Sequence, residues 1–125
     1  MTKSFLLLIC SGADQPLSWQ SALDFAQACQ QSPHHLARVF FYGSAVLQAN
    51  SLQDPDSHWP NLLPMWQELA QQGVDLVLCS TACYNHGIQE SSAEQQGNLA
   101  SGFRIGSLAD LSLMQQEVDH VIRFG

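Results

Sequence analysis

The sequence predicts an α/β fold with a mostly parallel sheet of about five strands, covered by helices on both faces. Short apolar runs alternate with amphipathic segments along all 125 residues, and no linker, repeat or low-complexity tract divides the chain. A strand, a helix and a second strand fit into about forty residues at the start, which is typical of a βαβ unit with a right-handed crossover. We expect residues 1–125 to form one domain.

The first βαβ unit opens the chain. Residues 3–10 are an almost continuous apolar run and predict a strand that is buried on both faces. Ser18 suits the N-cap of the following helix, because apolar residues recur after it at helical spacing as far as Cys29. Residues 36–42 predict the second buried strand.

The middle of the chain holds its least regular part. Residues 44–60 are rich in Asn, Asp and Pro, and they predict a long loop with one short helix at residues 45–49. Residues 62–72 carry apolar side chains on one helical face, and Gly73 fits the end of that helix. Residues 74–78 predict the third strand.

The last third continues the alternation. Residues 89–100 are polar and compatible with a helix, and residues 103–105 predict a short strand. Residues 108–116 predict a further helix, and the alternating residues 119–124 predict the fifth strand. Strands and helices that alternate throughout indicate a parallel sheet with both faces covered.

The stretch 73–87, GVDLVLCSTACYNHG, carries the strongest functional signal. Its apolar run ends on Cys79, and small polar residues that can open a helix follow. We expect this cysteine to lie where a strand meets the first turn of a helix, near unpaired backbone N–H groups, a setting that favours the nucleophilic thiolate. Cys79 is therefore the candidate catalytic residue, although most free cysteines are buried packing residues. Cys10 also ends a strand, so position alone does not separate the two; the small residues 80–82 after Cys79, which let a partner's sulfur approach, favour Cys79.

Two further residues of this stretch are candidates for an auxiliary role. Cys83 stands one helical turn after Cys79 and could close a disulfide with it, but a buried packing role is favoured. His86 precedes Gly87 at the expected end of the short helix, where capping or contact with solvent is favoured over a role as general base.

Composition excludes several classes of protein. Four basic residues against eleven acidic ones give a net charge of −7, which opposes direct binding to nucleic acid. The apolar run near the start is too short to span a membrane, so we expect a cytoplasmic protein. The four cysteines and five histidines lack the spacing of a zinc site or a disulfide framework, and no GxGxxG or P-loop pattern occurs. We therefore expect reduced thiols, no metal and no cofactor.

Several stretches of the sequence resemble one known family over nearly its full length. They are the opening strand with SGAD after it, the SALDFAQA helix, RVFFYGSAVLQAN, the WQELAQQGVDLVLC block, and the end from GFRIGSLADL to VIRF. These segments resemble the DsrE/TusD family of sulfur-relay proteins. The resemblance implies a three-layer α/β/α sandwich and assigns to Cys79 the role of carrying sulfane sulfur as a persulfide.

The same resemblance implies partners and a pathway. It implies a heterohexamer with homologous TusB-like and TusC-like (DsrH/DsrF-like) subunits, a TusA-like sulfur donor and a TusE-like acceptor. The relayed sulfur would serve 2-thiolation of the wobble uridine of tRNA, or oxidative sulfur metabolism as in DsrE-type relatives. Persulfide transfer needs an accessible, moderately acidic thiol and neither metal nor organic cofactor.

The chain departs from the family pattern beside the candidate cysteine. Relatives commonly have basic residues before the glycine that closes the active-site helix, whereas this chain has Tyr84, Asn85 and His86. Cys83 is not part of the family pattern either. Two other hypotheses therefore stay open: a dithiol redox protein that uses Cys79 and Cys83, and a structural subunit without chemistry of its own.

Overall fold

A single five-stranded sheet organises the molecule. The computed structural model describes residues 1–125, and every strand pairs in parallel with its neighbours in the order β4-β3-β2-β1-β5. The strands are β1 (Ser4–Ile9), β2 (His35–Phe41), β3 (Asp75–Cys79), β4 (Phe103–Gly106) and β5 (His120–Phe124). The predicted parallel sheet of about five strands is confirmed.

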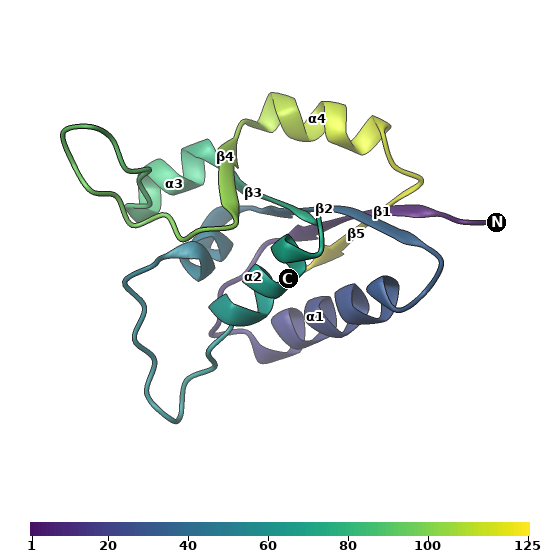
Figure 1. Cartoon of the computed structure of the whole chain (residues 1–125), viewed down its shortest axis with the longest axis horizontal. Coiled ribbons are helices and arrows are strands. Elements are labelled where there is room, and N and C mark those ends of the chain that lie inside the picture. Colours follow the sequence, from purple (N-terminus) through teal and green to yellow (C-terminus); the bar gives the residue numbers. More distant parts are fainter.

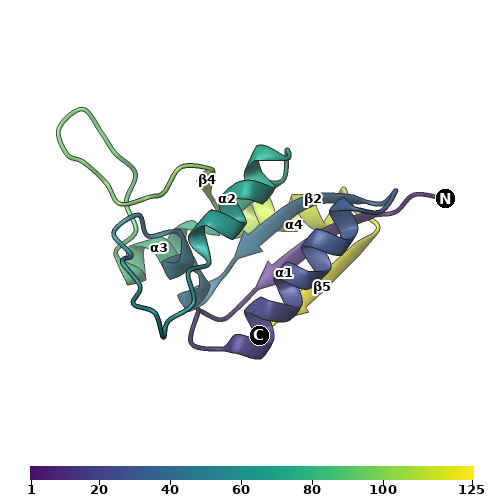
Figure 2. The same ribbon diagram turned by 60° about the horizontal axis from the view of Figure 1, so that its bottom comes forward.

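Helices form a layer on each face of this sheet. Helices α1 (Pro16–Gln30) and α2 (Leu63–Gln71) lie on one face, and α4 (Leu108–Gln116) lies on the other (Figures 1 and 2). The 3-10 helix η1 (Gly43–Ala49) and the short helix α3 (Ser80–His86) follow the carboxyl ends of β2 and β3. This is the expected three-layer α/β/α sandwich. None of its helices combines the length and the apolar character that crossing a bilayer requires.

Aromatic side chains fill the core between the sheet and α2. The Trp66 ring packs edge-on against Phe41, with 5.0 Å between the ring centroids, and Phe41 in turn meets Phe103 of β4 at 5.6 Å. The indole N–H of Trp66 donates a 2.8 Å hydrogen bond to the side-chain oxygen of the buried Gln48 in η1. Because an unpaired polar group at this depth is costly, the bond anchors η1 on the α2 side of the sheet.

Two expectations about the helices are wrong. The N-cap of α1 is Gln15, and the helix begins at Pro16, whose fixed φ suits the first helical position, so Ser18 lies inside the first turn. Residues 89–100 form a loop and not a helix. Its serine side chains bond to nearby backbone groups, as when Ser91 accepts a hydrogen bond from the N–H of Gly97, and such bonds compete with helix formation.

Candidate functional site

The carboxyl ends of β3 and β4 lie side by side in the sheet. After β3 the chain enters α3, which packs on η1, and after β4 it enters α4 on the face opposite α1 and α2. In open α/β sheets, ligands and reactive groups gather beyond the carboxyl ends of the strands. Cys79 is the last residue of β3, and it pairs there with Gly106 of β4.

Cys79 joins the strand to the helix, as the sequence predicts. Its backbone is extended, with φ −63° and ψ 124°, and it is the N-cap of α3. Its sulfur makes no capping hydrogen bond to the backbone of this seven-residue helix. The residue is only 1% exposed. Neighbouring side chains must therefore move before a partner's sulfur can reach Cys79.

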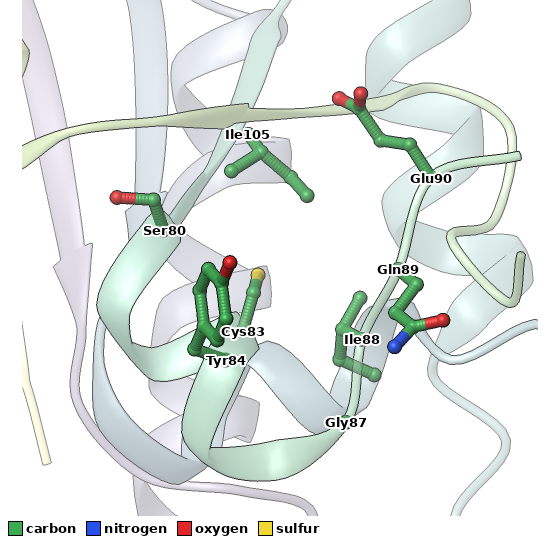
Figure 3. Close-up of a pocket in the computed structure, with 8 residues that line it drawn as sticks. All are labelled: Ser80, Cys83, Tyr84, Gly87, Ile88, Gln89, Glu90 and Ile105. Carbon is green, nitrogen blue, oxygen red and sulfur yellow. The ribbon is translucent and has the colours of Figure 1, made fainter. Parts of the chain in front are cut away.

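A cavity of about 490 Å³ lies between α3, the segment after it and β4. Its walls are formed by eight residues, which Figure 3 shows as sticks: Ser80, Cys83, Tyr84, Gly87, Ile88, Gln89, Glu90 and Ile105. Cys79 is not among these residues, although Ser80, which follows it directly, is. Tyr84 is 92% exposed and stands at the mouth of the cavity.

Cys83 differs from Cys79 in its access to this cavity. It is 3% exposed, and its sulfur points toward the space between α3 and Ile105 without a hydrogen-bond partner. Burial above all, together with the charges of Cys79 and Glu90, raises the pKa of Cys83 to about 11. Cys83 therefore stays a neutral thiol at neutral pH and is a poor nucleophile there.

His86 lies outside the cavity. It is the last residue of α3, is exposed and takes part in no side-chain hydrogen bond. Gly87 ends the helix with a left-handed φ of 73°, as expected for the glycine that follows His86. Of the three predicted site residues, Cys83 lines the cavity, Cys79 directly precedes the lining residue Ser80, and His86 does not line it.

The wall formed by residues 88–90 is held by Asn98. The Asn98 side chain accepts a 2.8 Å hydrogen bond from the N–H of Gln89 and donates a 3.0 Å bond to the carbonyl of Gly87. It also donates to the side chain of Asn50 after η1, at 3.3 Å. Because residues 89–100 were expected to form a helix, Glu90 was not predicted to line a cavity. Gly97 and Asn98, which are typical of turns, were the signal for a loop.

Charged side chains are distributed unevenly over the molecule. Arg38 and Arg104 both bond to Asp75 at the start of β3, at 3.1 and 2.8 Å, and Arg38 also bonds to Glu117 after α4 at 2.6 Å. Residues 43–102, which supply α3 and seven of the eight cavity residues, contain no Lys or Arg. No cluster of three or more His, Cys, Asp or Glu side chains is arranged to hold a metal ion.

Comparison with known proteins assigns the chain to a family. The model of the DsrE/DsrF-like family matches residues 3–124, from before β1 to the end of β5. The chain belongs to the DsrE/DsrF-like family. Two proteins named Sulfurtransferase TusD, from Yersinia pestis (strain Pestoides F) and Yersinia pseudotuberculosis (serotype O:1b, strain IP 31758), are each 35% identical to it over 126 residues, which is 96% of either chain. These relatives identify this member of the DsrE/DsrF-like family as a sulfurtransferase.

Solved structures show the same fold. The ychN protein from E. coli superimposes with a TM-score of 0.74 at 23% identity, covering 99% of this chain and all of that one. A protein of unknown function, MTH1491 from Methanobacterium thermoautotrophicum, superimposes with a TM-score of 0.68 at 16% identity, covering 97% of this chain and 98% of its own. At these identities the likeness establishes the DsrE/DsrF-like fold alone.

Proposed function

We propose that Cys79 accepts sulfane sulfur as a persulfide and passes it between small carrier proteins. The position of Cys79 supports this proposal. Cys79 is the last residue of β3, at the carboxyl end of the parallel sheet, and the next residue, Ser80, lines a cavity; the chain belongs to a family with members named sulfurtransferases. In the outgoing step, a partner thiolate attacks the outer sulfur of the persulfide. A sulfur–sulfur bond forms to the partner, the bond to Cys79 breaks, and Cys79 leaves as a thiolate.

The state of Cys83 favours a relay through one cysteine over a dithiol redox pair. A resolving thiol must attack as a thiolate, and the pKa of Cys83, raised to about 11, keeps it protonated at neutral pH. A neutral neighbour leaves the persulfide on Cys79 intact until a partner arrives. We assign Cys83 a packing role in the cavity wall and give His86 no part in the transfer.

The assembly and the destination of the sulfur follow from the family resemblance. We propose a cytoplasmic hetero-oligomer with TusB-like and TusC-like subunits, a TusA-like donor, a TusE-like acceptor, and tRNA wobble-uridine 2-thiolation as the end of the route. The net charge of −7 supports transfer between proteins, with the RNA left to a later enzyme. Deleting the gene and measuring 2-thiouridine in tRNA by mass spectrometry tests the destination, because an unchanged level excludes it.

The test of the persulfide itself uses a sulfur-carrier protein that has been loaded with persulfide. Wild-type protein, Cys79→Ser and Cys83→Ser are incubated with this donor, and added sulfur is located by intact and peptide mass spectrometry. We expect sulfur on Cys79 in wild type and in Cys83→Ser, and none in Cys79→Ser. A competent donor that leaves no sulfur on the wild-type chain contradicts the proposal and favours a structural subunit.

Mild oxidation followed by disulfide mapping separates the relay from the redox alternative. The relay predicts that Cys83 stays a free thiol. A disulfide between Cys79 and Cys83 that forms readily, together with loss of activity in both single variants, favours the dithiol protein.

A further inference from the structure

A second cavity of about 490 Å³ lies between the start of α1 and the loop before α2. Figures 1 and 2 both show this loop beside the first turn of α1. This α1 cavity is lined by aromatic, proline and polar side chains, among them Asp14, Pro16, Trp19, His58, Trp59 and Pro60. None of these residues lines the cavity beside α3, so the two sites are separate.

Two indole rings give the α1 cavity a surface that attracts cations. Trp59 is 50% exposed, although its ring is large and apolar. Asp56 fixes the turn that carries this ring: its carboxylate accepts a 2.8 Å hydrogen bond from the N–H of His58, and its carbonyl accepts one from the N–H of Trp59 at 3.2 Å. Trp19 is partly buried, and its indole N–H is buried without an acceptor in the chain. The face of an indole ring is electron-rich and binds cations better than a Tyr or Phe ring does.

The charged groups of the α1 cavity favour a cation as well. Asp14 is exposed, lines the cavity and takes part in no salt bridge with any basic residue of the chain. No Lys or Arg lines the cavity, and Asp54 and Asp56 add two carboxylates to the same loop. His58 is the one lining residue that can become positive, and an imidazole is neutral in mild alkali. A cation therefore complements the charge of this cavity.

We propose that the α1 cavity binds an arginine side chain of a partner protein. A guanidinium is planar, so it stacks on the indole face of Trp59 while its N–H groups donate to the carboxylate of Asp14. A backbone carbonyl beside that arginine supplies an acceptor for the orphaned N–H of Trp19, which a simple alkylammonium ion cannot do. The cavity shares no lining residue with the one beside α3, so this inference is independent of the persulfide relay.

Two short peptides that differ only in charge test the proposal. Each has acetylated and amidated ends and one central residue between glycines, which is arginine in one peptide and citrulline, its uncharged isostere, in the other. Isotope-labelled protein gives one indole N–H signal in NMR spectra for each of the three tryptophans, and the fully buried Trp66 is the internal control. At about pH 7.5 the arginine peptide should shift the signals of Trp19 and Trp59 but not that of Trp66, with a dissociation constant on the order of 1 mM. The citrulline peptide should bind about tenfold more weakly.

Matched variants show which groups of the α1 cavity bind the peptide. Trp59→Ala removes the exposed ring and Asp14→Asn removes the negative charge, and each should weaken binding of the arginine peptide about fivefold. Tyr84→Ala removes an exposed ring from the other cavity, and Asp24→Asn neutralises an exposed carboxylate of α1; both should bind like wild type. An unchanged Trp66 signal in each variant shows that the core is intact.

Several results would overturn the arginine site. They are equal affinity for the two peptides, unmoved signals of Trp19 and Trp59 at about 10 mM arginine peptide, and full affinity in both Trp59→Ala and Asp14→Asn. Weaker binding in Tyr84→Ala would also overturn it, because the peptide would then occupy the cavity beside α3. Failure of the relay is distinguishable, since Cys79→Ser should lose sulfur transfer and still bind the arginine peptide like wild type.

Discussion

The two ends of strand β3 use polar residues in opposite ways. At its start, Asp75 accepts hydrogen bonds from both Arg38 and Arg104, and Arg38 extends the network to Glu117. At its end, four residues later, Cys79 takes part in no ion pair and caps α3 without a side-chain hydrogen bond, and Glu90 is the one charged residue among those that line the cavity beside it. Because alternate residues of a strand share one face, Asp75 and Cys79 belong to the same side of the sheet.

The charged residues that stabilise the fold thus lie at one end of β3, and the candidate reactive residue lies at the other. The arginines tie β2, β3 and the end of α4 together, so they contribute to the scaffold. The side chains that support the carboxyl end of β3 are instead uncharged. Gln48 anchors η1, on which α3 packs, and Asn98 holds the loop that follows α3. Substitutions at the charged end should therefore change stability alone, whereas those at the other end should also change the reactivity of Cys79.

The largest expected effect comes from Gln48→Ala. It leaves the indole N–H of Trp66 and the carbonyl of Ser11 without partners, since Gln48 bonds to both. We expect a loss of about 3 kcal/mol in the free energy of unfolding, because each buried group left unsatisfied is costly. Because α3 packs on η1, alkylation of Cys79 by iodoacetamide should also become faster. Urea unfolding and timed mass spectrometry measure the two effects.

Gln53→Ala is the matched control for Gln48→Ala. Gln53 donates to the carbonyls of Gln48 and Asn50 in a partly exposed region, where water can replace the lost donor. Its cost should be about 1 kcal/mol or less. Equal losses of unfolding free energy in the two variants would show that the burial of Gln48 does not account for its contribution to stability.

Asp75→Asn tests the charged end of β3. Losing the carboxylate between two arginines should cost about 2 kcal/mol, since hydrogen bonds to charged groups are stronger than neutral ones. The rate of Cys79 alkylation should stay at the wild-type value. A changed alkylation rate at native pH would break the distinction between the two ends of the strand.

The pH dependence of stability provides a second measure of Asp75. Hydrogen bonds from Arg104, helped by Arg38, hold the pKa of Asp75 below its ordinary value of 3.8. A depressed pKa stabilises the fold fully above 3.8, and the contribution is lost as the pH falls through the lower folded value. Acid should therefore destabilise wild type more than Asp75→Asn, as urea unfolding at pH 5 and at about pH 3 can show.

The sheet and the position of Cys79 could be predicted from the sequence, because a short apolar run followed by small polar residues is typical of a buried strand that leads into a helix. Prediction from the sequence failed where contacts between residues far apart in the chain determine the local structure. Residues 89–100 contain good helix formers, but Asn98 bonds to Gln89 and Asn50 and holds the segment as a loop. The cavity wall, including Glu90, depends on that loop. Arg38, Asp75 and Arg104 likewise meet only after three strands have paired.

Ser107→Ala tests whether α4 contributes to the reactive edge at which it begins. The Ser107 hydroxyl accepts a 3.1 Å hydrogen bond from the N–H of Asp110, and the Asp110 carboxylate accepts a 2.8 Å bond in return. Loss of this capping box should cost about 1 kcal/mol. Thermal unfolding measures it. Reactivity of Cys79 should not change, and an increase would mean that α4 shields the cysteine.

The smallest effect at neutral pH is expected for Cys83→Ala, which becomes visible only in alkali. Burial and the neighbouring charges raise the pKa of Cys83 from 9.0 to about 11. Between these values the unfolded chain releases this proton while the folded chain keeps it, so the raised pKa makes wild type lose stability as the pH rises. The unfolding free energy of wild type should therefore fall more steeply from pH 8 to about pH 11 than that of Cys83→Ala. Parallel curves would mean that Cys83 ionises freely in the folded protein, and the case for a neutral neighbour beside the Cys79 persulfide would then be lost.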